Sequence, residues 1–223
     1  MDILLLITAS LITLCAQYFV TTTYNRYSKI KSKKNITGFE VARKILDSYG
    51  MNNVYITETV GKLSDHYDPS RKVIRLSTEV FHGNSISSCA VAAHEVGHAI
   101  QDKKNYSFLK TRNLIIPFVN FVSYAGYLAI LIGIIFASQN LILIGIATEI
   151  IILLFQLITL PVEFDASKRA LTELKNINVL TTKELILSEK VLRAAAFTYV
   201  SSVINTILQI LRLLLIFGNS DRD

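Results

Sequence analysis

Two histidines and a glutamate stand close together in the stretch AVAAHEVGHAIQ, residues 90–101. Residues four apart share one face of an α-helix, so the imidazoles of His94 and His98 can reach the same ion. Imidazole nitrogen is a common ligand of Zn²⁺, and Glu95 lies close enough to reach a water on that ion. A lone histidine on an apolar helix is more often a hydrogen-bonded core residue. The full H-E-x-x-H spacing arises by chance in roughly 1% of cases or fewer at ordinary composition, and it predicts one Zn²⁺ per chain.

A catalytic zinc usually takes three protein ligands and keeps a fourth position for water. The further candidates among the histidines and acidic residues are His66, His82, Glu149, Glu163 and Asp165. Glu163 is favoured because it directly follows an apolar run that can bring the chain back to the side carrying His98. Glu149 lies about 20 Å up the same predicted helix at 1.5 Å per residue, too far to share the site. We predict Glu163 as the third ligand, with Asp165 as the alternative.

Long apolar runs identify an integral membrane protein. Hydrophobic residues make up 51% of the 223 residues, and they gather into runs near the 20 residues that a helical span needs. The runs are Ile3–Val20, Leu114–Ala137, Leu141–Val162 and the more polar Tyr199–Phe217. The first has no basic segment before it, so we interpret it as an uncleaved anchor rather than a secretory signal. The predicted fold is a mainly α-helical integral membrane protein with three to four transmembrane helices and a small β-sheet.

The distribution of the basic residues predicts which side of the membrane the polar segments face. The formal net charge is +6, yet most lysines and arginines lie between Arg26 and Arg112 or between Lys168 and Arg193. The connection 138–140 has none. Basic residues collect in cytoplasmic loops, so we expect a multi-pass protein of the cell membrane whose active site faces the cytoplasm. This pattern argues against a nucleic-acid partner, and the two cysteines suggest no disulfide framework.

The polar segments contain the elements that position the histidine block. Thr37 with Glu40, and Thr181 with Glu184, form capping boxes that each open a helix. Short β-rich runs predict a small sheet whose last strand is about Lys72–Ser77, and the histidine helix begins near Ser85. A separate helix is expected at about Asp165–Leu174. The predicted regions are an N-terminal transmembrane anchor (1–22), a cytoplasmic region with the sheet and the HEVGH helix (23–113), a transmembrane hairpin (114–162), cytoplasmic helices with the third ligand (163–198), and a C-terminal transmembrane or interfacial helix and tail (199–223).

The last apolar run carries a stripe of polar residues on one helical face. Its members are Ser201, Asn205, Gln209 and Arg212. A polar stripe in a span turns toward protein or water, unless the helix lies along the interface. Arg212 and Glu149 fall at matching depths if both helices cross from the same side, so we predict that they form an ion pair. The alternative is a polar groove that feeds membrane-embedded substrates to the zinc.

Beyond these patterns, the chain resembles the YugP-type membrane zinc metallopeptidases, a family of neutral bacterial metallopeptidases. The resemblance covers almost the whole chain through TGFEVARKIL, LSDHYDPSRKVIRLS, SISSCAVAAHEVGHAIQ, LPVEFDASKRAL and VLRAAAFTYV. More distantly, it is similar to the HtpX and CAAX-protease class, in which the third ligand opens an E-x-x-x-D segment. Glu163 of EFDAS falls on that ligand. Ser167 stands where that class has aspartate, so the carboxylate behind the ligands is either missing or supplied by another residue, such as Asp165.

The resemblance implies a gluzincin-like core and a zinc-dependent endopeptidase that cleaves membrane or membrane-proximal proteins. In this mechanism Glu95 is the general base, and Tyr199 and Arg193 are candidates for holding the oxyanion. Contact with phospholipid headgroups is an equal alternative for Arg193. His66 is a candidate for orienting the substrate, against an ordinary histidine in a surface turn. The strand Lys72–Ser77 looks like the edge on which such enzymes bind substrate as an added strand.

Two other classes of function compete with this one. A membrane scaffold or regulator stabilised by zinc would not need Glu95 beside the ligands. A transporter component would explain Glu149 and Arg212 but not the histidine block. The expected partners are a polypeptide substrate and membrane lipid, and the sequence does not identify an adaptor or an oligomeric partner.

Overall fold

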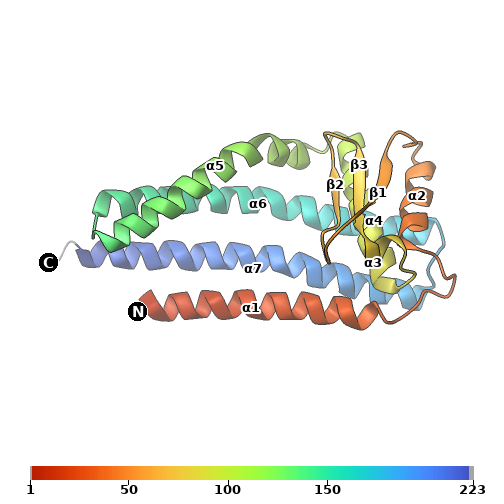
Figure 1. The fold of residues 1–223 in the computed structure, drawn as a ribbon, viewed down its shortest axis with the longest axis horizontal. Helices are drawn as coiled ribbons and strands as arrows, with labels where there is room; N and C mark the ends of the chain where they lie inside the picture. Colours follow the sequence, from red (N-terminus) through yellow and green to blue (C-terminus); the bar gives the residue numbers. More distant parts are fainter. Residues whose placement is uncertain (1, 221–223) are drawn as a thin grey trace. The chain divides into compact units, whose positions relative to one another are not determined.

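The computed structural model describes residues 2–220, and within them the fold is mainly helical (Figure 1). The elements in chain order are α1 (Asp2–Tyr27), α2 (Gly38–Ser48), β1 (Tyr55–Thr59), β2 (His66–Asp68), β3 (Val73–Ser77), α3 (Thr78–Phe81), α4 (Ile86–Lys103), α5 (Ser107–Ile135), α6 (Gln139–Asn176) and α7 (Thr182–Ser220). The described residues form two compact units, one of 2–17, 110–161 and 198–220, the other of 18–109 and 162–197. The mainly helical fold with a small sheet is confirmed.

Four helices of the described chain are long and apolar enough to cross a membrane, namely α1, α5, α6 and α7. Large apolar side chains such as Leu4, Phe121 and Leu154 are more than half exposed on them, as expected where lipid rather than water is the solvent. The polar stripe of α7 is used in part for packing within the first unit. There the Asn205 side-chain amide donates a hydrogen bond to the hydroxyl of Thr13 on α1.

The helix that carries Glu163 does not break where the apolar run ends. The predicted separate helix from Asp165 is wrong, because α6 continues without interruption through Pro161 to Asn176. Proline removes one backbone donor, but neighbouring groups can compensate for this in membrane helices. The continuation is stabilised by Ala166, Ala170 and Leu174, which recur every four residues and are fully buried in the second unit.

The predicted capping boxes are present at the starts of both helices. The Thr37 hydroxyl accepts from the backbone N–H of Glu40 at 3.2 Å, and the Glu40 carboxylate accepts from the backbone N–H of Thr37 at 2.8 Å. Thr181 and Glu184 make the same reciprocal pair before α7. Gly50 lies just past α2 with a φ of 62°, a left-handed conformation that favours glycine and ends the helix.

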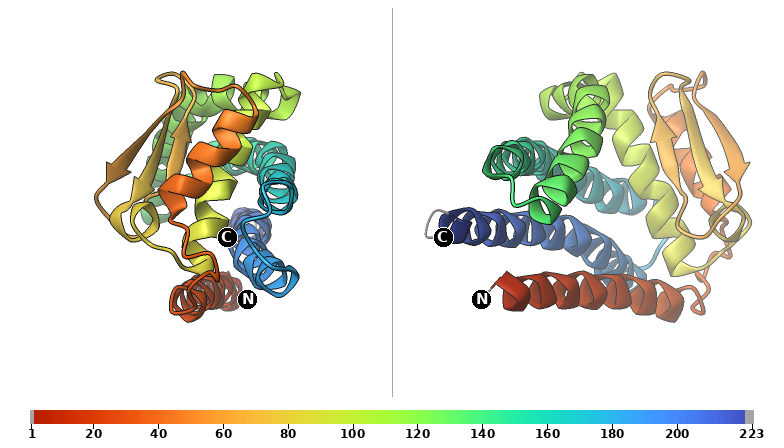
Figure 2. Two further views of the ribbon diagram at one scale, coloured as in Figure 1. Left: turned by 90° about the vertical axis from the view of Figure 1, so that its right-hand side faces the viewer. Right: turned by 60° about the vertical axis from the view of Figure 1, so that its left-hand side comes forward.

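The sheet has the order β1-β3-β2, so β3 is its central strand. β3 pairs in parallel with β1 and antiparallel with β2, and Ile74 lies opposite Ile56 on one side and Tyr67 on the other. The expectation that this strand is a free edge is therefore wrong. Figure 2 shows α2 and α4 side by side against the sheet in the second unit. Fully buried residues such as Val41, Leu46 and Ile74 form the core between these elements.

Candidate metal centre

The histidine helix α4 is buried along most of its length in the second unit. Its start is capped by Ser85, whose hydroxyl accepts a hydrogen bond from the backbone N–H of Ser88 at 3.1 Å. Small residues such as Ala92 and Ala93 are almost completely buried, so neighbouring elements pack directly on the helix. The side chains of His94 and His98 are only 15% and 10% exposed. Two imidazoles are therefore held on one face, largely shielded from solvent.

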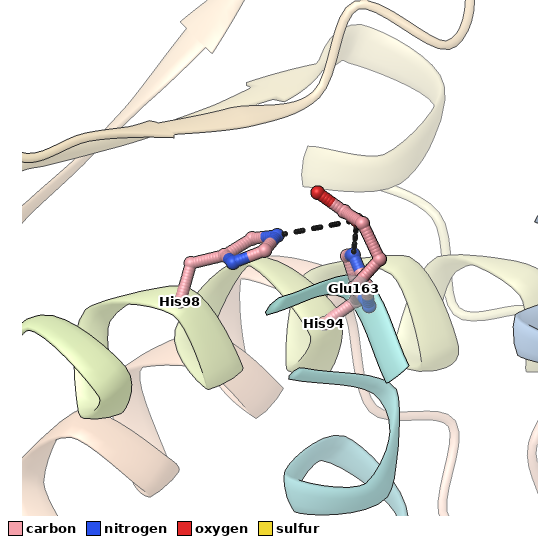
Figure 3. A group of neighbouring side chains, drawn as sticks. All are labelled: His94, His98 and Glu163. Carbon is pink, nitrogen blue, oxygen red and sulfur yellow. Dashed lines mark ion pairs between the residues drawn. The ribbon is translucent and has the colours of Figure 1, made fainter. Parts of the chain in front are cut away.

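Glu163 of α6 meets both histidines within the second unit (Figure 3). Its Oε2 atom lies 3.3 Å from His94 Nε2 and 3.7 Å from His98 Nε2. One potential ligand atom from each residue falls within 4.8 Å of the others, and the Glu163 side chain is only 3% exposed. Two imidazole nitrogens and one carboxylate oxygen in a small buried cluster fit the ligand set of a catalytic Zn²⁺. The residues present therefore suit the predicted metal.

Gly97 allows α6 to pass close enough to α4 for this meeting. A Cβ atom at position 97 would lie 2.6 Å from the backbone oxygen of Ala166 on α6. Because that neighbour is backbone, it cannot move aside as a flexible side chain can. Any larger residue at 97 would thus push apart the two helices that carry the ligands. Gly97 lies between His94 and His98 on α4, and the residue that it contacts on α6, Ala166, is three residues after Glu163.

A buried glutamine fixes the orientation of the second histidine. The side-chain amide of Gln101 donates hydrogen bonds to the backbone oxygen of Val162 at 2.7 Å and to Asp165 Oδ2 at 2.8 Å. Because the –NH₂ group of Gln101 makes both of these hydrogen bonds, the other side-chain atom, the oxygen Oε1, is the one that faces His98 Nδ1 at 3.0 Å. His98 must then carry its proton on Nδ1, which leaves the lone pair of Nε2 available for a metal.

Two further polar groups near the ligands come from the EFDAS segment itself. Ser167 Oγ lies 3.2 Å from His94 Nδ1, so a hydroxyl rather than a carboxylate contacts this ring nitrogen. Asp165 contacts Gln101 rather than a histidine, so its effect on the ligands is indirect. Its carboxylate also accepts a hydrogen bond from Arg169 Nε at 2.6 Å. The carboxylate behind the ligands is therefore Asp165, reached through Gln101.

Replacing Gln101 by leucine is expected to weaken zinc binding by about 10- to 100-fold, the usual effect of losing such a supporting contact. The variant keeps the volume of the side chain but frees the His98 ring to rotate and change tautomer. Competition with a chromogenic chelator measures the affinity. Tyr67→Phe is a matched control, because it removes a 2.7 Å hydrogen bond to Asp102 on the same helix without touching the ligands. If the folded Gln101→Leu variant binds zinc with unchanged affinity, Gln101 does not support the ligand His98.

Burial is the largest influence on the pKa values of Glu95 and His98. Glu95 is only 7% exposed, and burial raises the pKa of its carboxyl; the charges of His94 and His98 counteract this shift, whereas Glu163 and Asp65 add to it. For His98, burial by itself would lower the pKa, but the hydrogen bond and charge of Glu163 outweigh it and raise the pKa. The site therefore holds a carboxyl group that gains a proton more readily than usual beside the ligands.

None of the other predicted histidine and acidic residues joins the metal-ligand cluster within the described chain. His66 is exposed and lies against Ser64 and Arg75. His82 is exposed and pairs with Glu58. The side chain of Arg193 is 79% exposed and pairs with Glu189 one turn earlier at 2.7 Å, so the structure does not bring it to the ligands. Tyr199 and Glu149 belong to the first unit, and the role of Tyr199 stays a prediction.

Sequence reasoning missed Gln101 and Asp65. Gln101 follows His98 by three residues, which places both on one helical face, so this spacing was a usable signal. Asp65 lies immediately before β2 and accepts hydrogen bonds from the backbone N–H and the hydroxyl of Ser77. Its charge acts on Glu95, thirty residues away in the sequence. No local sequence pattern predicts that Asp65 and Glu95 lie near each other.

Comparison with known proteins agrees with this geometry. A family model described as "Putative neutral zinc metallopeptidase" matches residues 2–218. The chain is also 44% identical over 204 residues to a Bacillus subtilis (strain 168) protein named "Putative membrane protease YugP", with 92% of this chain and 91% of that protein covered. No solved structure matches the chain significantly. The family match spans nearly all of the sequence and includes the buried His-His-Glu cluster, so the chain belongs to this family of neutral zinc metallopeptidases.

Proposed function

We propose that the protein is a membrane-embedded zinc endopeptidase that hydrolyses peptide bonds of membrane or membrane-proximal proteins at the cytoplasmic face. The observation that carries this proposal is the buried cluster of His94, His98 and Glu163 with the carboxyl group of Glu95 next to it. One Zn²⁺ per chain would be held by these three ligands. The cytoplasmic orientation is supported by the lysines and arginines on both polar segments.

The residues of the second unit can divide the chemistry of peptide hydrolysis among them. Zn²⁺ at this site would supply a Lewis acid that polarises the scissile carbonyl and activates water. The Glu95 carboxylate would accept the proton of the attacking water and later deliver it to the leaving amine. Gln101 and Ser167 would hold the two imidazoles in the orientation that directs both Nε2 atoms at the ion. Outside the second unit, Tyr199 is the residue proposed to donate to the oxyanion.

The substrate is proposed to pair with the outer edge of β2 as an added strand. β3 cannot accept a further strand because both of its sides are occupied. β2 is at the edge of the sheet and packs against the histidine helix α4. The Tyr67 hydroxyl of β2 donates to Asp102 of α4 at 2.7 Å, which fixes this edge relative to the ligands. Backbone pairing of this kind selects extended polypeptides over small molecules.

A peptide substrate that is N-methylated at one backbone nitrogen near the scissile bond is expected to be cleaved about 2- to 10-fold more slowly. This factor corresponds to the loss of one hydrogen bond, about 0.5–1.5 kcal/mol. Scanning the methyl group along the peptide should give losses at alternate residues, since only every second N–H of a strand faces its partner. Equal rates at all positions would argue against strand pairing.

Hydrolysis should fail toward acid pH as the buried carboxyl group of Glu95 gains a proton. The reactive form of Glu95 is the carboxylate, whereas burial favours the protonated form and raises the pKa. Activity is therefore full above the raised pKa and is lost as pH falls through it. A log(kcat/KM) profile, recorded with zinc content at each pH, measures the midpoint. A rate that stays constant as the pH falls, while zinc stays bound, would contradict the assignment.

The proposal is tested with the purified full-length chain. Elemental analysis should give one zinc per chain, and an unfolded protein such as casein should be cleaved. Stripping the metal with 1,10-phenanthroline should abolish cleavage, and stoichiometric Zn²⁺ should restore it. One tightly bound zinc without hydrolysis of any peptide, including segments of co-purified membrane proteins, would favour the zinc-stabilised scaffold instead.

A further inference from the structure

The first unit contains a cavity of about 340 Å³ that is lined by two opposite charges. It lies between α5, α6 and α7, and both Glu149 of α6 and Arg212 of α7 contribute to its wall. The ion pair predicted between them is not formed anywhere in the part of the chain that the structure describes. Instead, the Arg212 Nη1 atom makes a 3.5 Å hydrogen bond to Gln209 Oε1. The two charges therefore face a shared space rather than each other.

Arg212 is poorly satisfied by the protein around it. Its Nε atom is buried and has no hydrogen-bond partner, while the guanidinium group carries five N–H donors. A charged group left without partners at membrane depth costs several kcal/mol. The helix places this charge in a cavity opposite a carboxyl group. This arrangement indicates a bound group that supplies an anion to Arg212 and a cation to Glu149.

The cavity extends from the end of the first unit that holds the turn between α5 and α6 toward the middle of these helices. Glu149 is ten residues from the start of α6, about 15 Å along the helix axis. Arg212 is eight residues from the end of α7, about 12 Å along its axis. Ile134, which also lines the cavity, is one residue from the end of α5. Half of a hydrocarbon core about 30 Å thick is about 15 Å, so Arg212 lies in the leaflet on this side and Glu149 lies near the middle of the core. A headgroup that contacts both charges is therefore drawn below the membrane interface.

The remaining walls suit the part of a lipid next to its headgroup. Ile130, Leu131 and Ile152 provide an apolar surface beside the charges. The wall between α5 and α6 is tightly packed, because a Cβ at Gly145 would lie 2.3 Å from Ile130 Cγ1. A volume of about 340 Å³ is at the small end of ligand pockets, which fits a headgroup while its acyl chains stay in the bilayer.

We propose that this cavity binds the headgroup of a zwitterionic phospholipid with a primary ammonium, such as phosphatidylethanolamine. The phosphate would lie against the guanidinium of Arg212, whose planar fork of donors matches phosphate oxygens. The ammonium would donate to the Glu149 carboxylate. An anionic headgroup without an amine would satisfy only Arg212 and bring a negative charge toward Glu149. Phosphatidylcholine would offer a cation without N–H donors.

Native mass spectrometry of the full-length protein tests this assignment. The protein is mixed with equimolar dioleoyl phosphatidylethanolamine, phosphatidylcholine and phosphatidylglycerol of equal chain length. The wild type is expected to retain phosphatidylethanolamine about tenfold over each of the others. Arg212→Gln and Glu149→Gln should each abolish that preference. Ser202→Ala, an exposed position of α7 outside the cavity whose hydroxyl bonds only its own helix, should leave it unchanged.

Several outcomes would overturn the proposal. Equal retention of the three lipids by the wild type would do so without any variant, so the test does not depend on whether Arg212→Gln folds. A lipid preference that survives both neutralising variants would place the lipid elsewhere. If the charge swap Glu149→Arg with Arg212→Glu restores the thermal stability lost in each single variant, and no lipid is retained, the two residues pair with each other. Retention of a polar transmembrane peptide instead of lipid would also reject it.

Discussion

Replacing Glu95 by glutamine is expected to lower kcat/KM for peptide hydrolysis by about 10²- to 10⁴-fold, the usual contribution of a positioned acid or base. Glutamine keeps the size of a side chain that is only 7% exposed, so the packing of α4 should survive. Its amide cannot accept a proton from water or return one to the leaving amine. Zinc should still bind, because Glu95 is not one of the three residues whose ligand atoms converge. Rates and metal content are measured on the same preparation.

The matched control for this variant is Glu58→Gln. Glu58 is an exposed glutamate of β1 that pairs with His82 at 3.3 Å, and its replacement should change neither zinc content nor rate. Full zinc content with a wild-type rate in Glu95→Gln would remove Glu95 from the mechanism. Loss of zinc together with activity would instead assign Glu95 a role in building the site.

Local patterns in the sequence predicted those features that depend on residues near one another along the chain. The capping boxes at Thr37 and Thr181 depend on a spacing of three residues, and the pairing of His94 with His98 depends on one helical turn. The apolar runs identified the helices long enough to span a membrane, since a span needs only length and composition. Glu163 was found by a topological argument that needed the order of the spans but no three-dimensional contact.

Features that depend on long-range pairing were not predictable in this way. β3 is the central strand because β2 pairs with its second side. The sequences of β1 and β2 are similar short β-rich runs, so they do not show which strand lies in the centre. The apolar run ends at Val162, but α6 continues because Ala166 and Ala170 find a buried surface supplied by distant segments. Matching depths suggested that Glu149 and Arg212 pair, yet depth alone does not fix the direction in which either side chain points.

The replacement of Gly97 by alanine is expected to reduce kcat/KM by about 10²-fold, because ligand groups misplaced by about 1 Å can cost that much. The added Cβ would lie 2.6 Å from the backbone oxygen of Ala166. The contact can be relieved only by moving α6 away from α4, and that movement carries Glu163 away from His94 and His98. Zinc affinity should fall together with activity, as measured by chelator competition.

The expected effect on folding follows from two opposing contributions. Alanine favours a helix over glycine by about 1 kcal/mol, whereas overpacking of a buried contact costs about 1–3 kcal/mol. The free energy of unfolding should therefore fall or change little, while the metal site is strongly weakened. Gly218→Ala is the matched control, because nothing lies within 4 Å of a Cβ at that position near the end of α7, and it should leave zinc affinity and activity unchanged. A Gly97→Ala protein with wild-type zinc affinity would show that the close approach of α6 is not what holds Glu163 against the histidines.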